Sequence, residues 1–395
     1  MGFLRKWRGY MAVLAAAVAC YAALGAVLRA TPTYVGDRLG GGAIAVGLAV
    51  GAPAITGAVL RPLGGRWSDR LGARPMVIAG AVLMAFGVLP AWQVSLGAFV
   101  VSRLLVGAGE AMMMAATVLW LLRLAGEEHQ GRSLGHIGLA NYAGLTIGPL
   151  LVELVGLHRT DRLWVLASVL PLVGAAAAAV QRDAPRPVEH EEPAPILAMV
   201  RRTGRPGAGL LLVNIGYVAV LSFGATLVAS RGLGIAALIV PVFGVGVIVS
   251  RVALGSLPDR FGAARVLAVA ALVEAAGLAG FAVSGAAPLS VAALVVLSVG
   301  QGLAVPSLGV LAVADVPTHQ RGAASGAFFA WFDAGVGLGG PAVGVVARLS
   351  SPEAAVVAAG VAVAAVLPVV FLRHRPVRSS TQRRQRTAPS SAATR

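Results

Sequence analysis

Twelve long apolar segments constrain the fold of this chain more than any other feature of its sequence. A helix needs about 20 apolar residues to cross the roughly 30 Å of hydrocarbon in a bilayer. The segments are too long for strands and lack the two-residue alternation of strands that face lipid. The sequence therefore predicts an all-α membrane protein whose twelve transmembrane helices cover residues 9–29, 41–61, 75–94, 97–122, 133–155, 163–181, 207–229, 233–254, 264–284, 288–312, 322–346 and 353–372.

Composition agrees with lipid as the main solvent. Hydrophobic residues make up 57% of the chain and charged residues only 12%, against about 25% charged residues in soluble globular proteins. The formal net charge of +16 raises the possibility of a nucleic-acid partner. Most of the cations, however, lie in short gaps between apolar segments, where they act as topology signals. We therefore expect a lipid bilayer as partner, and no nucleic acid.

The distribution of cations predicts the orientation. With the N-terminus in the cytoplasm, 25 of the 32 Lys and Arg residues fall in cytoplasmic segments and six in external ones. Cytoplasmic loops carry the excess of cations in membrane proteins. We therefore expect a multi-pass protein of the cytoplasmic (inner) membrane with both termini inside.

The one cysteine, Cys20, lies within the first apolar segment. A single cysteine excludes a disulfide within the chain, and the sequence has no cluster of metal ligands. It also has no phosphate-binding loop and no catalytic constellation in its loops. We therefore expect no metal, no cofactor and no enzymatic activity. The basic residues before the first apolar segment resemble a signal peptide, but the segment is long enough to span and we expect it to be retained.

Two loops repeat. Residues 61–74 read RPLGGRWSDRLGAR and residues 251–265 read RVALGSLPDRFGAAR. Arg61 and Arg251 correspond at an offset of 190 residues. The same offset joins further pairs from the two loops, namely Gly65 with Gly255, Asp69 with Asp259, Arg70 with Arg260, and Gly72 with Gly262. Each loop follows the second apolar segment of its half.

A second repeat lies in the fifth and eleventh segments. Gly144 and Gly148 correspond to Gly335 and Gly339 at an offset of 191 residues. Nearly equal offsets in two separate segments indicate that a six-helix unit is duplicated. Because six is an even number, the two units insert with the same orientation and leave a central cavity between them.

The duplication predicts four regions. They are an N-terminal half at residues 1–181, a cytoplasmic linker at 182–206 with a short helix near Ile196–Arg202, a C-terminal half at 207–372, and a basic disordered tail at 373–395.

The doubled loop resembles the signature loop of the major facilitator superfamily. Arg103, Gly107 and Gly109 resemble the fourth-helix motif of that family, and Gly144, Gly148 and Pro149 resemble the fifth-helix motif of its proton-driven antiporters. The resemblance covers essentially the whole chain and implies a bacterial, efflux-like transporter. It also implies that the doubled loop is a latch for one alternating-access state, formed by Gly65, Asp69, Arg70, Gly72, Arg74, Gly255, Asp259, Arg260 and Gly262.

The loop residues have other interpretations. Asp69 and Asp259 precede the next helices, where a carboxylate can cap free N–H groups. The alternative interpretation of the cations is that they are topology signals alone. The sequence departs from the family pattern after Gly72, where Ala73 precedes Arg74, and after Pro149, where the glycine pair of the full antiporter motif is missing. The glycines of the fifth segment either bend the helix during switching or serve packing only.

Charged residues well inside the predicted spans are candidates for function. Arg103 and Glu110 are seven residues apart on the fourth span, so they share a helix face. Charges in lipid are costly and face a cavity or a partner. Glu110 and Asp333 are therefore candidate proton sites, with Arg103 tuning Glu110 or binding an anionic group. The alternative is a structural ion pair. Glu274 ranks lower, because the ninth span is a peripheral support in the resembled fold.

Neutral polar side chains within the spans are candidates for the substrate cavity. They are Tyr21, Asn141, Tyr142, Asn214, Tyr217, Gln301 and Trp331. Each alone is more often an interhelical contact, but together they indicate an apolar pocket with a few directing polar groups.

These observations predict a monomeric secondary transporter that moves a small molecule by alternating access. Proton-coupled efflux is the favoured mode. A uniporter or symporter for a sugar or organic acid is one alternative, and a non-transporting receptor or scaffold on the same fold is another.

Overall fold

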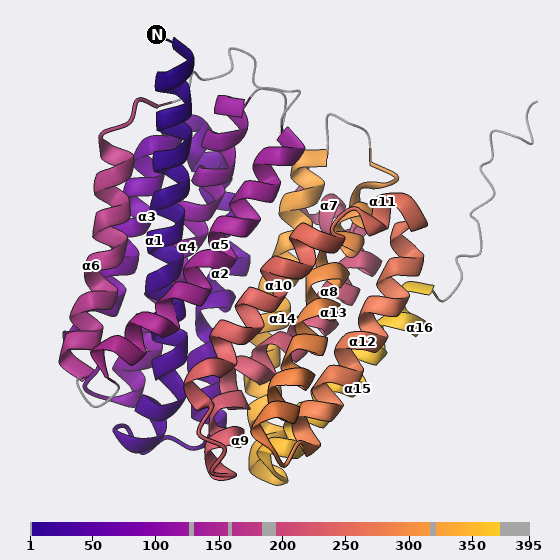
Figure 1. Ribbon diagram of the computed structural model, residues 1–395. Coiled ribbons are helices and arrows are strands. Elements are labelled where there is room, and N and C mark those ends of the chain that lie inside the picture. The colour runs from indigo at the N-terminus through magenta and orange to yellow at the C-terminus, as the bar shows by residue number, and fades with distance from the viewer. Residues whose placement is uncertain (1, 126–129, 157–159, 184–194, 317–320, 372–395) are drawn as a thin grey trace, which may run out of the picture.

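The structure is a computed structural model that describes residues 2–125, 130–156, 160–183, 195–316 and 321–371. Within these ranges it is a bundle of helices without strands. Helices α1 to α6 form one side of the bundle and helices α8 to α16 the other, while the N-terminus, α7 and α11 lie at one end (Figure 1). We call this the N-terminal end of the bundle.

The first group of helices contains α1 (Gly2–Asp37), α2 (Ala43–Leu71), α3 (Ala73–Val88), η1 (Pro90–Trp92), α4 (Leu96–Ala125), α5 (Gln130–Val155) and α6 (Thr160–Ala179). The second group contains α7 (Ile196–Arg202), α8 (Gly204–Ala219), η3 (Val220–Gly224), α9 (Ala225–Ser230), η4 (Ala236–Leu238), α10 (Ile239–Leu254), α11 (Leu257–Phe261), α12 (Ala263–Val283), α13 (Ala287–Val313), α14 (Arg321–Leu349), α15 (Pro352–Ala364) and α16 (Val366–Phe371).

The twelve predicted spans each coincide with helical structure. Among the described residues, eleven helices are long and apolar enough to cross a membrane. The third span, α3, is a shorter apolar helix. The seventh span is continuous over Gly204–Ser230 and contains η3, one turn of π-helix between α8 and α9. The prediction of an all-α, twelve-helix membrane protein is therefore confirmed.

Large apolar side chains lie on the outside of the bundle. Leu154 is 83% exposed, Leu349 is 82% exposed and Val180 is 79% exposed. A water-soluble monomer rarely exposes extended apolar surface. Lipid tails solvate such side chains without cost, so this exposure agrees with a bilayer as the surrounding medium.

Two pairs of long helices form most of the contact between the two groups of helices. α2 packs along α14, and α10 packs against α5. Close approach of α2 and α14 depends on glycine, because a Cβ on Gly47 would lie 2.1 Å from the carbonyl oxygen of Gly340. Small residues at a helix interface allow van der Waals packing where lipid removes the hydrophobic driving force between helices. This contact lies at the end of α2 that is remote from the N-terminal end of the bundle.

Part of the predicted linker and the whole predicted tail lie outside the described residues. The linker's short helix is α7, at the predicted Ile196–Arg202. Residues 184–194 and 372–395 fall outside the description.

Candidate functional site

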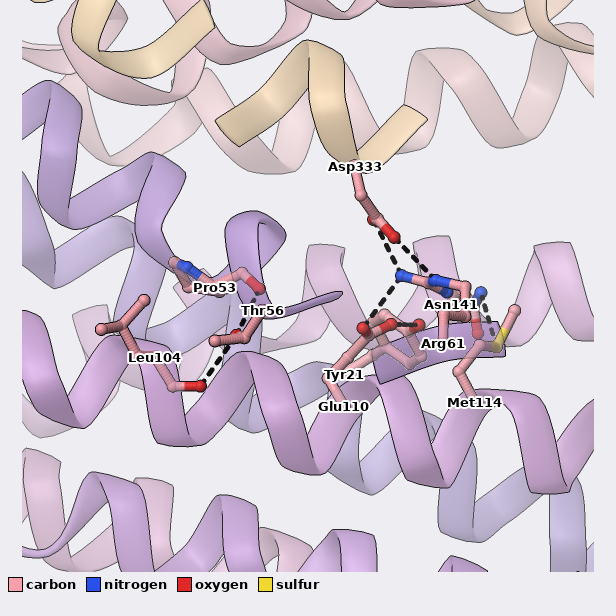
Figure 2. A network of polar contacts seen from close by, with 9 residues as sticks. All are labelled: Tyr21, Pro53, Thr56, Arg61, Leu104, Glu110, Met114, Asn141 and Asp333. Atoms are coloured by element: carbon pink, nitrogen blue, oxygen red, sulfur yellow. Dashed lines mark hydrogen bonds and ion pairs between the residues drawn. The ribbon is translucent and has the colours of Figure 1, made fainter. Parts of the chain in front are cut away.

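Arg61 of α2 lies at the centre of a charged network between the two groups of helices. Its Nε donates to Asp333 Oδ2 at 2.8 Å and its Nη2 donates to Asp333 Oδ1 at 2.9 Å. The same Nη2 donates to Glu110 Oε2 at 3.0 Å, and the hydroxyl of Tyr21 donates to Glu110 Oε1. Figure 2 shows Arg61 lying between the two carboxylates. Four residues from α1, α2, α4 and α14 are thus brought together; we call them the Arg61 network.

Packing between α2 and α4 holds Arg61 beside Glu110. A Cβ on Gly107 would lie 1.9 Å from the carbonyl oxygen of Pro53, so the two backbones touch one turn before Glu110. Thr56 Oγ1 donates to the carbonyl oxygen of Leu104 at 2.8 Å and links the same helices (Figure 2). The backbone of α2 therefore sits at a fixed distance from α4.

Close approach of α2 and α14 places Asp333 within reach of Arg61. A Cβ on Gly57, one turn before Arg61, would lie 3.3 Å from the carboxylate of Asp333. The glycine leaves room for the carboxylate to pass α2 and reach the guanidinium. Removal of this space by a larger residue would push α14 away from α2.

The Arg61 network is shielded from bulk solvent. The side chains of Arg61, Glu110 and Asp333 are 16%, 11% and 4% exposed. With both carboxylates ionised, one guanidinium faces two negative charges, and the network carries one negative charge in excess. Buried charges are tolerated only when they are paired and hydrogen-bonded. The arrangement can therefore accept a proton without losing its cation.

Arg103 does not belong to this network. Its guanidinium carbon lies 4.7 Å from the centroid of the Phe99 ring and 5.8 Å from that of Trp164. Its Nε and Nη2 donate to Ser102 Oγ at 3.1 Å and 3.0 Å. Although Arg103 and Glu110 share a helix face, the cation that pairs with Glu110 is Arg61, not Arg103. Cation–π contacts with Phe99 of its own helix and with Trp164 of α6 hold Arg103 instead.

Sequence reasoning assigned Arg61 only to the repeated loop. It stands at the cytoplasmic edge of a predicted span, beside other cations, and looks like a topology signal. Helix α2, however, continues ten residues beyond Arg61 to Leu71. The one available signal was the repeat itself, since Arg61 and Arg251 correspond at a position that lies inside a helix in both halves.

Arg251 of α10 faces α5. Its guanidinium carbon lies 4.5 Å from the centroid of the Tyr142 ring, and its Nη2 is 3.5 Å from the Tyr142 hydroxyl. A Cβ on Gly138 would lie 3.4 Å from Arg251 Nη1. Tyr142 is thus one predicted cavity residue that meets a cation from the other group of helices.

The other predicted cavity residues are distributed over both groups. Tyr21 belongs to the Arg61 network, and Asn141 Nδ2 lies 3.7 Å from the sulfur of Met114. Asn214 Nδ2 donates to the carbonyl oxygen of Leu210 in its own helix. Its Oδ1, both polar atoms of Gln301 and Nε1 of Trp331 are buried without a hydrogen-bond partner.

Tyr217 lies in an aromatic cluster. Its ring centroid is 5.7 Å from that of Phe243 and 6.2 Å from that of Phe332. The three rings come from α8, α10 and α14, so they join the helices of the second group next to Asp333.

Comparison with known proteins identifies the family. The sequence profile of the Major Facilitator Superfamily matches residues 13–340 and 242–394. The chain belongs to the major facilitator superfamily. An uncharacterized MFS-type transporter of Salmonella typhimurium is 32% identical over 339 residues, which are 82% of this chain and 86% of that protein. One from Burkholderia mallei is 30% identical over 372 residues, which are 91% of each chain.

Solved structures of this superfamily share the fold. The crystal structure of the nucleoside transporter NupG matches with a TM-score of 0.75 at 15% identity and covers 92% of this chain and 98% of its own. That of the human organic anion transporter MFSD10 matches with a TM-score of 0.70 at 16% identity and covers 92% and 99%. At these identities the similarities show a shared fold.

In this superfamily member, the repeated loops break their helices at glycine. Gly72 has φ 105° and Gly262 has φ 86°, values that strain any residue with a Cβ. Each glycine is the N-cap of the following helix, α3 or α12. Asp69 and Asp259 therefore lie inside α2 and α11 and do not occupy the N-cap positions.

Other residues of the predicted latch lie on the surface of the transporter. Arg70, Gly255, Asp259 and Arg260 are exposed, and a Cβ added at Gly65 would meet no atom within 4 Å. The side chain of Asp69 lies outside the described residues. Arg74 donates through its guanidinium to the carbonyl oxygen of Ala179, and its backbone N–H donates to Asp183 Oδ1 at 3.2 Å. Arg74 thus ties the start of α3 to the end of α6.

The glycines of α5 provide close packing against α1. A Cβ on Gly144 would lie 2.6 Å from the carbonyl oxygen of Val18, and one on Gly148 would lie 2.2 Å from that of Ala22. Pro149 lies inside α5, which continues unbroken to Val155. The contacts bring α1, and with it Tyr21, close to the transporter's centre.

Glu274 lies away from the Arg61 network. It is 1% exposed on α12, and its Oε2 has no hydrogen-bond partner. A Cβ on Gly216 would lie 2.9 Å from its Oε1. Glu274 therefore fills a space between α8 and α12 of the transporter and pairs with no cation in the described part of the chain.

Proposed function

We propose that the chain is a proton-coupled secondary transporter that exports a small molecule by rocking of two six-helix halves, residues 1–181 and 207–372. The observation that carries the proposal is the Arg61 network. Two carboxylates share one guanidinium, and Asp333 belongs to a different half from Arg61 and Glu110. A change in protonation at this place acts directly on the contact between the halves.

The coupling step follows from charge balance. A proton on Asp333 converts its carboxylate into a neutral acid and weakens its pair with Arg61, while Arg61 keeps its pair with Glu110. Loss of a hydrogen bond between charged groups costs about 1.5–3 kcal/mol, which is enough to shift an equilibrium between two conformations by about tenfold or more. Proton binding therefore favours separation of α2 from α14, and proton release favours their contact.

Glu110 supplies the second proton site. Tyr21 and Arg61 both donate to its carboxylate, so the ionised form is held when the halves are in contact. When the halves separate, Arg61 either moves with Asp333 or pairs with an anionic substrate. Glu110 then loses the hydrogen bond from Arg61 and takes up a proton. Alternation between these two states couples proton movement to movement of the halves.

The proposed mechanism also includes the orientation of the protein in the membrane and its oligomeric state. The bias of cations supports an inner-membrane protein with both termini in the cytoplasm. With that orientation, the contact of Gly47 with Gly340 closes α2 against α14 on the external side. The latch residues and the glycines of α5 then accompany the conformational change, and the protein works as a monomer.

The test uses everted membrane vesicles with an imposed pH gradient and a panel of drugs, sugars and organic acids. Export coupled to protons makes a substrate collapse the gradient in vesicles that carry the wild-type chain. We expect Glu110→Gln and Asp333→Asn to abolish this collapse. Glu153→Gln is the matched control, because Glu153 pairs with Arg29 on α1 and takes no part in the Arg61 network.

Each other outcome of the vesicle assay leads to a different conclusion. Uptake of a compound that leaves the gradient intact and persists in both carboxylate variants indicates a uniporter. Collapse that survives in Glu110→Gln but not in Asp333→Asn leaves Asp333 as the only proton site. Binding of a compound without any transport of it indicates a receptor on the same fold.

A further inference from the structure

The two arginines of the repeat occupy equivalent places. Arg61 and Arg251 correspond at an offset of 190, and Asp333 and Tyr142 correspond at the offset of 191 that relates Gly335 to Gly144. In the structure Arg61 of α2 meets Asp333 of α14, and Arg251 of α10 meets Tyr142 of α5. The second contact is thus the repeat of the first, with tyrosine in place of the carboxylate.

Glu110 has a neutral counterpart. Gly109 and Gly300 precede Glu110 and Gln301, and both glycines touch the backbone of the neighbouring helix. A Cβ on Gly109 would lie 2.5 Å from the carbonyl oxygen of Gly80 on α3. One on Gly300 would lie 2.7 Å from that of Ala270 on α12. The same packing therefore places the Gln301 side chain in the second half at the position that corresponds to Glu110 in the first half.

Gln301 also lies next to the helix that carries Arg251. The residue after it, Gly302, packs against Ser250, because a Cβ on Gly302 would lie 1.8 Å from Ser250 Oγ. Gln301 is fully buried at 0% exposure. Neither its Oε1 nor its Nε2 has a hydrogen-bond partner. A buried amide with four unused hydrogen-bonding sites is costly, so a missing partner is indicated.

The second half thus keeps the cation of the network and lacks both of its carboxylates. Arg251 forms no ion pair with any described residue, and its buried Nε has no hydrogen-bond partner. Its contact with Tyr142 at 3.5 Å is at the limit of a hydrogen bond. The ring of Tyr142 stabilises the face of the guanidinium and leaves its edge donors free. A half-buried cation inside a membrane-spanning helix, with no counter-ion among the described residues, calls for an anion.

We propose that Arg251, supported by Tyr142 and Gln301, is the binding site for the carboxylate of a monoanionic organic substrate. The proposal names the substrate class of the transport function proposed above and rests on it. A guanidinium stacked on an aromatic ring presents two parallel N–H groups that match the two oxygens of a carboxylate. Gln301 Nε2 supplies a further donor to the same anion.

The charges at the site favour a carboxylate over a phosphate. The site has one cation and otherwise neutral groups, so it balances a single negative charge. A dianionic phosphate would remain half uncompensated in a membrane interior. Phe243 precedes Arg251 by eight residues on α10, about 12 Å along the helix axis, and belongs to the aromatic cluster with Tyr217. The apolar part of a carboxylate substrate can pack against these aromatic rings.

The experiment measures thermal unfolding of the purified full-length chain in detergent at constant ionic strength. The probes are acetate and benzoate, each compared with its neutral amide, acetamide or benzamide. We expect both carboxylates, and benzoate more strongly, to raise the melting temperature of the wild-type chain, whereas the amides leave it unchanged. In Arg251→Gln the carboxylate affinity falls about tenfold or more, as loss of a charge-assisted hydrogen bond implies.

Two further variants separate binding from a folding defect. Gln301→Glu is nearly isosteric and installs the counterpart of Glu110. We expect it to raise the melting temperature without ligand, because it compensates Arg251, and to abolish the response to carboxylates. Arg265→Gln removes an exposed arginine of the same half and should leave the response unchanged.

Three results would overturn the inference. They are a carboxylate response retained in Arg251→Gln and Gln301→Glu, an equal response to acid and amide, and no response of the wild-type chain to either acid. The binding assay needs no proton gradient. If the carboxylate response depends on Arg251 but no substrate collapses the pH gradient in vesicles, the proton coupling is refuted and the binding site stands. If a substrate collapses the gradient but carboxylates do not bind through Arg251, the binding site alone is refuted.

Discussion

Arg61 Nε lies 2.8 Å from Asp333 Oδ2, although the two residues are 272 positions apart in the sequence. The pair crosses from one half of the transporter to the other, and the neighbouring contact with Glu110 keeps the guanidinium in place. We call the contact between α2 and α14 the α2–α14 seam; in the proposed mechanism, a change of charge there drives a change of conformation.

Removal of Arg61 should have the largest effect of any single substitution in this seam. Arg61→Gln leaves two buried carboxylates without a cation, which costs about 3–5 kcal/mol. We expect a clear drop in the melting temperature in detergent and loss of transport. Arg66→Gln, on the exposed face of the same helix, should change neither. Equal melting curves for both variants would show that the network does not hold the halves together.

The hydroxyl of Tyr21 should matter for coupling more than for folding. Tyr21→Phe removes one donor to Glu110 and keeps the ring, at a cost of about 1.5–3 kcal/mol for a hydrogen bond to a charged group. Because this change acts on the ionised form of Glu110, the pH dependence of transport should shift. Tyr34→Phe loses a hydroxyl bond to the carbonyl oxygen of Gln93 and is the control, with an unchanged pH profile. Identical profiles for both variants would remove Tyr21 from the coupling step.

Gly47 should be intolerant of any side chain. Gly47→Ala places a Cβ against the carbonyl oxygen of Gly340 and prevents the close contact of α2 with α14. We expect lower stability and a transporter that cannot reach the described conformation, measured by melting temperature and by transport rate. Gly36→Ala adds a methyl group into open space on α1 and should raise stability by about 0.5–1 kcal/mol. An unchanged melting temperature and transport rate in Gly47→Ala would show that function does not require the close contact of α2 with α14.

Glu274 should be dispensable. Its carboxyl group is buried on α12 with an oxygen that lacks a partner, which costs about 1–3 kcal/mol. Glu274→Leu replaces it with an apolar side chain of similar size, so the melting temperature should rise and transport should continue. A variant that folds well but transports nothing would instead assign Glu274 a role in the transport cycle.

Much of the architecture was predictable from local patterns. Span length and hydropathy located the helices, because a bilayer of fixed thickness demands long apolar segments whatever their neighbours are. The offsets of 190 and 191 residues paired Arg61 with Arg251 and Gly144 with Gly335, since a duplicated unit keeps its spacing. The same reasoning selected Glu110 and Asp333, because a carboxylate inside a span needs a partner.

The identity of that partner was not predictable from the spacing along one helix. Seven residues place Arg103 and Glu110 on one face of α4, but the Phe99 and Trp164 rings hold Arg103. Arg61 reaches Glu110 because Gly107 lets α2 touch α4, and it reaches Asp333 because Gly57 lets α14 pass α2. Such contacts depend on backbone distances between helices that are far apart in the sequence.

The sequence by itself thus determined a duplicated bundle of transmembrane helices and the helices that carry buried charge. Only the tertiary structure decided that Arg61 is paired twice, whereas Arg251 meets no carboxylate among the residues that the structure describes. The physical reason is that hydropathy and periodicity depend on each helix and its solvent, whereas an ion pair depends on which two helices approach closely enough for their side chains to meet.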